Sequence, residues 1–150
     1  MFARKSATDV FKYISLLDPA VDHESPALDW EKYLETRDEQ YIPLKEGCQA
    51  ARFHLRPIEP EQEKYALSMP SDAAKFYEYV AFGLHAVENF TVDGQPVAVK
   101  RKTVNNLERA DKKSLHQIFD ADLFKELGGI VATISRLDPL RYLGSRPSRK

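Results

Sequence analysis

Residues 71–88 (SDAAKFYEYVAFGLHAVE) carry the densest pattern of apolar positions in the chain. Their spacing predicts a single helix with two apolar flanks and a narrow polar seam between them. One stripe consists of Ala73, Phe76, Tyr77, Val80, Leu84 and Val87. The second consists of Tyr79, Phe82 and Ala86, and the seam holds Glu78 and His85. A helix that is apolar on two flanks is expected either to lie inside a fold or to be covered by a partner chain.

A second long helix is predicted near the C-terminal end. Residues 114–119 fit a short helix, Asp120 is a candidate cap, and residues 123–137 then show one apolar face at helical spacing. Gly128 and Gly129 lie inside this pattern, where each glycine costs about 1 kcal/mol relative to alanine. We therefore expect either a kink or close backbone packing, with residues 71–88 as the candidate partner.

Three shorter elements are predicted ahead of residue 71. Residues 29–40 fit an amphipathic helix capped by Asp29, residues 51–58 alternate like a half-buried strand, and residues 60–69 fit a helix that starts at a proline. The apolar patch at residues 10–17 fits a short strand and a helical turn equally well.

The region after residue 88 predicts a hairpin and then a loop. Residues 89–100 alternate on both sides of Asp93-Gly94, a two-residue turn signal, and Pro96 marks an edge strand. Residues 100–110 are polar and basic, and we expect a loop there.

Together these elements predict the α+β class, with a small, mostly helical domain and a short antiparallel sheet or hairpin. Residues 27–138 are expected to form that single domain. Residues 1–26 are expected to form an extended N-terminal arm with too few apolar groups for its own core, and residues 139–150 a basic C-terminal tail.

Composition narrows the class of protein. The chain has 150 residues, of which 43% are hydrophobic and 30% charged, as in ordinary globular domains. The net charge of -1 argues against a dedicated nucleic-acid binder. Charge is nevertheless uneven: residues 1–50 hold six basic and ten acidic residues, whereas residues 136–150 hold five and one. The two ends either meet between subunits or remain solvated.

No pattern for catalysis, a cofactor or a metal emerges from the sequence. The four histidines lie at no recognisable ligand spacing, and the single Cys48 excludes an internal disulfide. Nucleotide-binding glycine motifs and nucleophile motifs are absent. No apolar run approaches the roughly 20 residues that span a bilayer, and no secretory signal is apparent. We expect a non-enzymatic protein without cofactor, metal or membrane, acting inside the cell that makes it.

Contact surface is the remaining interpretation of the unassigned aromatic and basic residues. Trp30 either anchors its helix to the core or serves as an exposed anchor for a partner, a role for which tryptophan is favoured. The residues expected to contact a protein partner are Trp30, Tyr79, Phe82, Tyr142 and Arg146.

The order of several short segments resembles a known group of proteins. These segments are DWEKYLETRDEQYIPLKEG (29–47), ARFHLRPI (51–58), FGLHAVENF (82–90), DGQPV (93–97) and LFKELGGIVATISRL (123–137). In this order they resemble small proteins encoded in the structural gene clusters of tailed bacteriophages, of the tail-assembly chaperone-like or minor virion type. The similarity covers about residues 25–138, and its motifs are short.

The resemblance implies a protein that binds other phage structural proteins, or further copies of itself, during assembly or as a fixed part of the particle. It would act in the host cytoplasm or in the virion. Two alternatives stay open. One is a small phage-encoded inhibitor or adaptor of a host protein, anchored by Trp30, Tyr79 and Phe82. The other, less favoured, is a nucleic-acid-associated protein that uses residues 100–102 and the basic tail.

Overall fold

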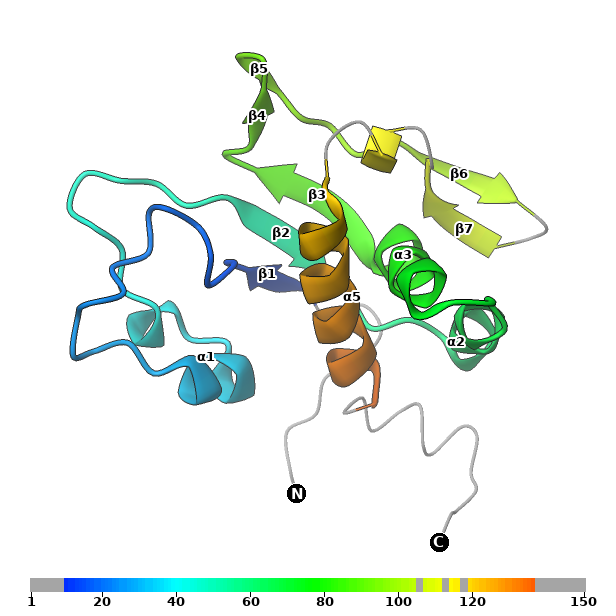
Figure 1. Ribbon diagram of the computed structural model, residues 1–150, viewed down its shortest axis with the longest axis horizontal. Coiled ribbons are helices and arrows are strands. Elements are labelled where there is room, and N and C mark those ends of the chain that lie inside the picture. The colour runs from blue at the N-terminus through cyan, green and yellow to red at the C-terminus, as the bar shows by residue number, and fades with distance from the viewer. Residues whose placement is uncertain (1–9, 105–106, 112–113, 117–118, 137–150) are drawn as a thin grey trace, which may run out of the picture. The chain divides into compact units, whose positions relative to one another are not determined.

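The computed structural model describes residues 10–104, 107–111, 114–116 and 119–136, and these form an α+β fold (Figure 1). The predicted fold class is confirmed. The helices are α1 (Trp30–Thr36), the 3-10 turn η1 (Glu39–Tyr41), α2 (Pro60–Leu67), α3 (Asp72–Gly83) and α5 (Ala121–Arg136). The strands are β1 (Phe11–Tyr13), β2 (Arg52–Leu55), β3 (Leu84–Glu88), β4 (Thr91–Val92), β5 (Gln95–Pro96), β6 (Arg101–Val104) and β7 (Leu107–Ala110).

Contacts divide the chain into two compact units. Unit 2 comprises Phe11–His54 and Ala86–Ala98, and unit 1 comprises Leu55–His85 and the described residues from Val99 onward. This division does not follow the expected boundary at residue 26, because Phe11, Tyr13 and Val21 are core side chains of unit 2. Residues 11–26 therefore belong to a packed unit. The expected basic tail, residues 139–150, lies outside the described residues.

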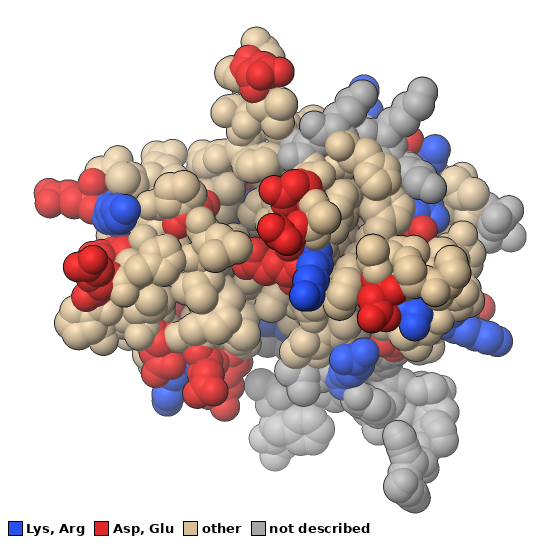
Figure 2. Space-filling view, viewed as in Figure 1, with Lys and Arg blue, Asp and Glu red and all other residues tan. Residues whose placement is uncertain are grey.

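Unit 2 is built around the tyrosine of α1. The Tyr33 side chain is fully buried, its hydroxyl oxygen accepts the amide N–H of Ile14 at 2.8 Å, and burial raises the pKa of the phenol. Asp29 caps α1 as predicted, accepting the N–H of Lys32. The apolar patch at residues 10–17, whose pattern fitted both a strand and a helical turn, contains the strand β1. The sheet order is β1-β2-β3. Figure 2 shows acidic side chains gathered over the part of the chain that carries α1.

The predicted hairpin at residues 89–100 is confirmed. β4 pairs with β5 antiparallel, with Val92 opposite Gln95. Asp93 and Gly94 between them both have positive φ, 53° and 79°, the conformation of a type I′ turn.

The predicted helix at residues 71–88 is wrong over its last five residues. Ser71 caps α3 as expected, but the helix ends at Gly83, and Leu84–Glu88 form the strand β3. The amide N–H of Arg56 donates to the carbonyl oxygen of Gly83 at 2.9 Å, so the backbone is already bonded outside the helix at this point. Pairing with a neighbouring segment overrides the local helical periodicity.

The loop predicted at residues 100–110 is also wrong. β6 and β7 form an antiparallel hairpin, with Arg101 opposite Ala110 and Val104 opposite Leu107. Most of its positions are charged or polar, so an apolar alternation is missing from the sequence. The hairpin is held instead by its ladder and by arginine contacts with α3, described below.

The largest packed contact in unit 1 joins α3 and α5. The predicted helix at residues 123–137 is confirmed as α5, and Asp120 accepts the N–H of Leu123 at its start. Of the two expectations for the glycine pair, close backbone packing is the one observed, because Gly128 lies against the backbone of Phe76. At the far end of α5, the Ser135 hydroxyl accepts the N–H of Ile58.

Candidate functional site

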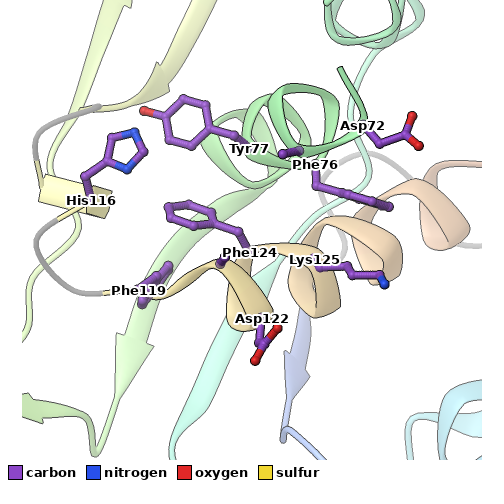
Figure 3. A pocket seen from close by; sticks show the side chains of 10 residues that line it. Asp72, Phe76, Tyr77, His116, Phe119, Asp122, Phe124 and Lys125 are labelled. Atoms are coloured by element: carbon purple, nitrogen blue, oxygen red, sulfur yellow. The ribbon is translucent and has the colours of Figure 1, made fainter.

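A pocket in unit 1 lies between the first turns of α3 and α5 and the described residues of segment 114–119 (Figure 3). Its volume of about 500 Å³ falls in the range of small-molecule and cofactor pockets. The lining residues are Asp72, Ala73, Phe76, Tyr77, His116, Phe119, Ala121, Asp122, Phe124 and Lys125.

Two capping residues fix the positions of the rim. The Ser71 hydroxyl oxygen accepts the N–H of Ala74, and the Asp120 carboxylate accepts the N–H of Leu123. Each cap starts its helix immediately before the residues that line the pocket. The rim of the pocket is thus formed by two helix starts, each with an aspartate in its first turn.

The inner wall is a continuous group of aromatic rings. Tyr77 and His116 stack with their planes 5° apart and their centroids separated by 4.8 Å. Phe124 contacts both rings, at centroid distances of 5.2 Å and 5.5 Å, and Phe119 lies edge-on to Phe124 at 5.6 Å. Figure 3 shows that these rings belong to three different segments of the chain: α3, the segment before α5, and α5. Such a wall offers apolar area and ring faces to an incoming group.

The phenol of Tyr77 is a hydrogen-bonding group at neutral pH. Burial raises its pKa to about 12, against the opposing effect of the Arg109 guanidinium nearby. A phenol with this pKa remains protonated, so it does not act as a base in this pocket.

A buried ion pair holds the neighbouring turn of α3. The Arg109 guanidinium lies 2.6 Å from a carboxylate oxygen of Glu78, and the two side chains are only 12% and 8% exposed. Arg109 also lies over the Phe82 ring, 5.3 Å from its centroid. Arg109 belongs to β7, so the β6–β7 hairpin covers Glu78 of α3.

A second arginine of the hairpin covers the C-terminal end of α3. The Arg101 guanidinium donates to the carbonyl oxygens of Leu84 at 2.6 Å and Phe82 at 3.3 Å. Carbonyls at a helix end lack partners within the helix and carry partial negative charge, so a guanidinium stabilises them. Burial lowers the pKa of Arg101, and Glu108 opposes this shift.

Two of the predicted partner-binding residues are core residues of unit 1. Tyr79 and Phe82 are 3% and 2% exposed, so the prediction that this flank offers a contact surface is wrong. The Tyr79 hydroxyl donates to the Glu63 carboxylate of α2 at 2.5 Å, and the Tyr65 ring packs edge-on against Phe82. The second apolar flank of α3 is covered within the unit, by α2 and by Arg109.

The other predicted partner residues give a mixed outcome. Trp30 is partly exposed and packs against Tyr13 and Tyr33, with ring centroids 5.8 Å and 5.4 Å apart. These contacts agree with the alternative in which Trp30 anchors its helix to the core. Tyr142 and Arg146 lie outside the described residues.

The histidines and the cysteine form no shared site in the described part of the chain. His54 lies 2.5 Å from the Glu88 carboxylate, in unit 2, and Cys48 is exposed. The described residues contain no group of three histidine, cysteine or acidic side chains placed to hold a metal ion. None of the described helices is both long enough and apolar enough to cross a membrane.

Phe119 belongs to the predicted helix at residues 114–119, but His116 and Phe124 were not predicted to contribute to a site. The helical pattern of residues 123–137 indicated Leu123 as its first buried position. Phe124 is buried instead, and Leu123 is only partly so. Residues 116–124 are rich in aromatic side chains, and this was the one indication of an aromatic cluster. Nothing in the sequence pattern connects that segment with Tyr77.

The chain matches none of the protein-family models, curated proteins or solved structures with which it was compared.

Proposed function

We propose that this chain is a non-enzymatic protein of a tailed bacteriophage that binds another phage structural protein, through the aromatic pocket of unit 1. The pocket is the observation that carries the proposal. It combines apolar ring area with a charged rim, which is the composition of protein-binding hot spots. The segment order that resembles phage structural-cluster proteins supports the choice of partner.

The pocket has room for one or more side chains of a partner protein. Aromatic residues at its wall are fixed by mutual ring contacts, so little side-chain entropy is lost when a partner group enters. Ala73 and Ala121 on the rim are exposed and small, which leaves the entrance wide.

A substitution that fills the pocket tests this proposal. Ala121→Trp places a large ring at the entrance, while the exposed Thr133→Trp on the same helix serves as the matched control. In the phage that carries the gene, we expect Ala121→Trp to lower the yield of complete particles, because a loss of roughly 1.4 kcal/mol weakens binding to the partner about tenfold. Thr133→Trp should leave the yield unchanged.

The folded state of both variants is checked first by circular dichroism and thermal unfolding. A normal particle yield with folded Ala121→Trp contradicts the proposal. Mass analysis of purified particles then distinguishes a fixed virion component, present in every particle, from an assembly factor that leaves before completion.

A further inference from the structure

Arg56 differs from the other arginines of unit 1 in having no acidic partner among the described residues. Arg101, Arg109 and Arg136 each have a nitrogen within 3.9 Å of a carboxylate oxygen. Arg56 is half-buried, and its Nε atom is fully buried without a hydrogen-bond partner. Burial removes part of the hydration of a guanidinium, so the missing acceptor leaves its charge poorly compensated.

Backbone contacts place Arg56 near a second arginine and a histidine. The amide N–H of Arg56 donates to the carbonyl oxygen of Gly83 at 2.9 Å. The Arg101 guanidinium donates to the carbonyl oxygen of Leu84, the next residue along the chain, at 2.6 Å. His85 follows directly and is half-buried. The three basic residues are therefore neighbours in unit 1, although they come from separate segments of the chain.

Positive charge is in excess around His85. Burial lowers the pKa of its imidazole, the charges of Arg101 and Arg56 lower it further, and Glu108 opposes them. Glu108 lies 3.4 Å from the Nε atom of Arg101, so its carboxylate offsets one guanidinium charge. One positive charge remains at neutral pH, and protonation of His85 adds a second.

We infer that Arg56, together with His85 and Arg101, binds one oxyanion, either a carboxylate or a phosphate group. A guanidinium presents its N–H groups as a planar fork that matches two oxygens of such a group. The His85 imidazole forms no hydrogen bond within the described residues, so its ring nitrogens remain available to the same anion. Arg101 is held against the end of α3 and contributes its charge. None of these residues lines the aromatic pocket, so the site is an addition to it.

The pKa of His85 in the full chain is the readout, followed by the chemical shifts of its ring protons. Sodium sulfate is the first probe, because sulfate does not titrate in this range, and sodium chloride at equal ionic strength is the reference. A bound anion favours the charged form of a neighbouring histidine. We expect saturating sulfate to raise the proton affinity of His85 about tenfold relative to chloride.

Arg56→Gln tests whether the guanidinium is the ligand. The substitution keeps the backbone hydrogen bond to Gly83, and sulfate and chloride should then give the same pKa for His85. Lys64→Gln is the matched control, because Lys64 is an exposed cation of α2 in the same unit. This control should keep the tenfold effect of sulfate. Circular dichroism and thermal unfolding first establish that both variants are folded.

Two peptides distinguish the sources of the oxyanion. Acetyl-Ala-Glu-Ala-amide and its glutamine analogue are compared near neutral pH, by the shifts of the Arg56 Nε–H and His85 ring signals. An affinity about three- to fivefold higher for the glutamate peptide assigns the site to an acidic side chain of a partner protein. Equal affinity for the two peptides, with the sulfate effect present, assigns it to a phosphate group.

Two results overturn the inference. One is the same pKa of His85 in sulfate and in chloride, and the other is a sulfate effect that persists in folded Arg56→Gln. Neither result bears on the aromatic pocket, which the particle yield of Ala121→Trp tests separately.

Discussion

Gly128 of α5 lies directly against the backbone of Phe76 in α3, so close that a Cβ atom on Gly128 would stand 2.7 Å from the Phe76 carbonyl oxygen. The neighbouring Gly129 has nothing within 4 Å of the corresponding position. A side chain at Gly128 would therefore collide with α3, whereas a side chain at Gly129 has free space.

Alanine substitutions at these glycines should change stability in opposite directions. Gly129→Ala should raise the free energy of unfolding by up to about 1 kcal/mol, because alanine is the better helix former. Gly128→Ala gains the same propensity but forces two backbones apart, at a cost of about 1–3 kcal/mol, so the net effect should be a loss. Urea unfolding of both variants measures the difference. A stabilised Gly128→Ala chain would show that α3 and α5 do not pack at this distance.

Arg101→Met should destabilise unit 1 by about 1.5–3 kcal/mol, because hydrogen bonds from a charged group to the carbonyls ending α3 are lost. The neighbouring Lys102→Met is the matched control: Lys102 is exposed and its ion pair with Asp111 lies at the surface, so its loss should cost at most about 1 kcal/mol. Urea unfolding again gives the measurement. Equal losses in the two variants would argue against a capping role for Arg101.

Lowering the pH from 6.5 towards 4 should destabilise the protein through His85. Burial lowers the pKa of His85 to about 4, and the charges of Arg101 and Arg56 act in the same direction, while Glu108 opposes them. An unfolded histidine has a pKa near 6.5, so within this window the unfolded chain binds a proton that the folded chain does not. Stability therefore falls as the pH falls.

His85→Gln provides the comparison for this effect, because glutamine is neutral at every pH in the window. Urea midpoints of both chains at pH 7.5 and pH 5 should show a larger loss in the unmodified chain. Carboxylates such as Glu88, whose pKa is lowered by its hydrogen bond with His54, lose their contribution at lower pH in both chains and cancel. The same midpoint shift in both chains would place the pH dependence elsewhere.

Local chemistry predicted the starts and turns of the elements well. Asp29, Ser71 and Asp120 cap helices because their side chains bond nearby amide groups, and Asp93-Gly94 turns because of its backbone preferences. Each of these features depends on residues within four positions of one another, so it is present in the sequence itself.

Features that depend on distant segments were the ones missed. The residues of β3 fit a helical pattern until Arg56 pairs with Gly83, and the β6–β7 hairpin is held by arginines whose partners lie on α3. From the sequence, Phe82 lies on a helix face with no assigned neighbour. In the structure, α2 and Arg109 cover that face. For the pocket, the sequence supplied Tyr77 and the helix starts, but only the packing of α3 with α5 joins them to Phe124.

The separation of α3 and α5 along the chain has a consequence for synthesis. α3 is complete at Gly83, yet the helix that covers its Phe76 and Gly83 side begins only at Ala121. A nascent chain therefore carries an uncovered apolar helix while about forty further residues are added, the interval in which unfinished chains are most prone to aggregate. Contacts between such distant segments also slow folding. Rapid translation of the segment between the two helices, or a chaperone bound to α3 in the interval, would protect the protein at its most vulnerable stage.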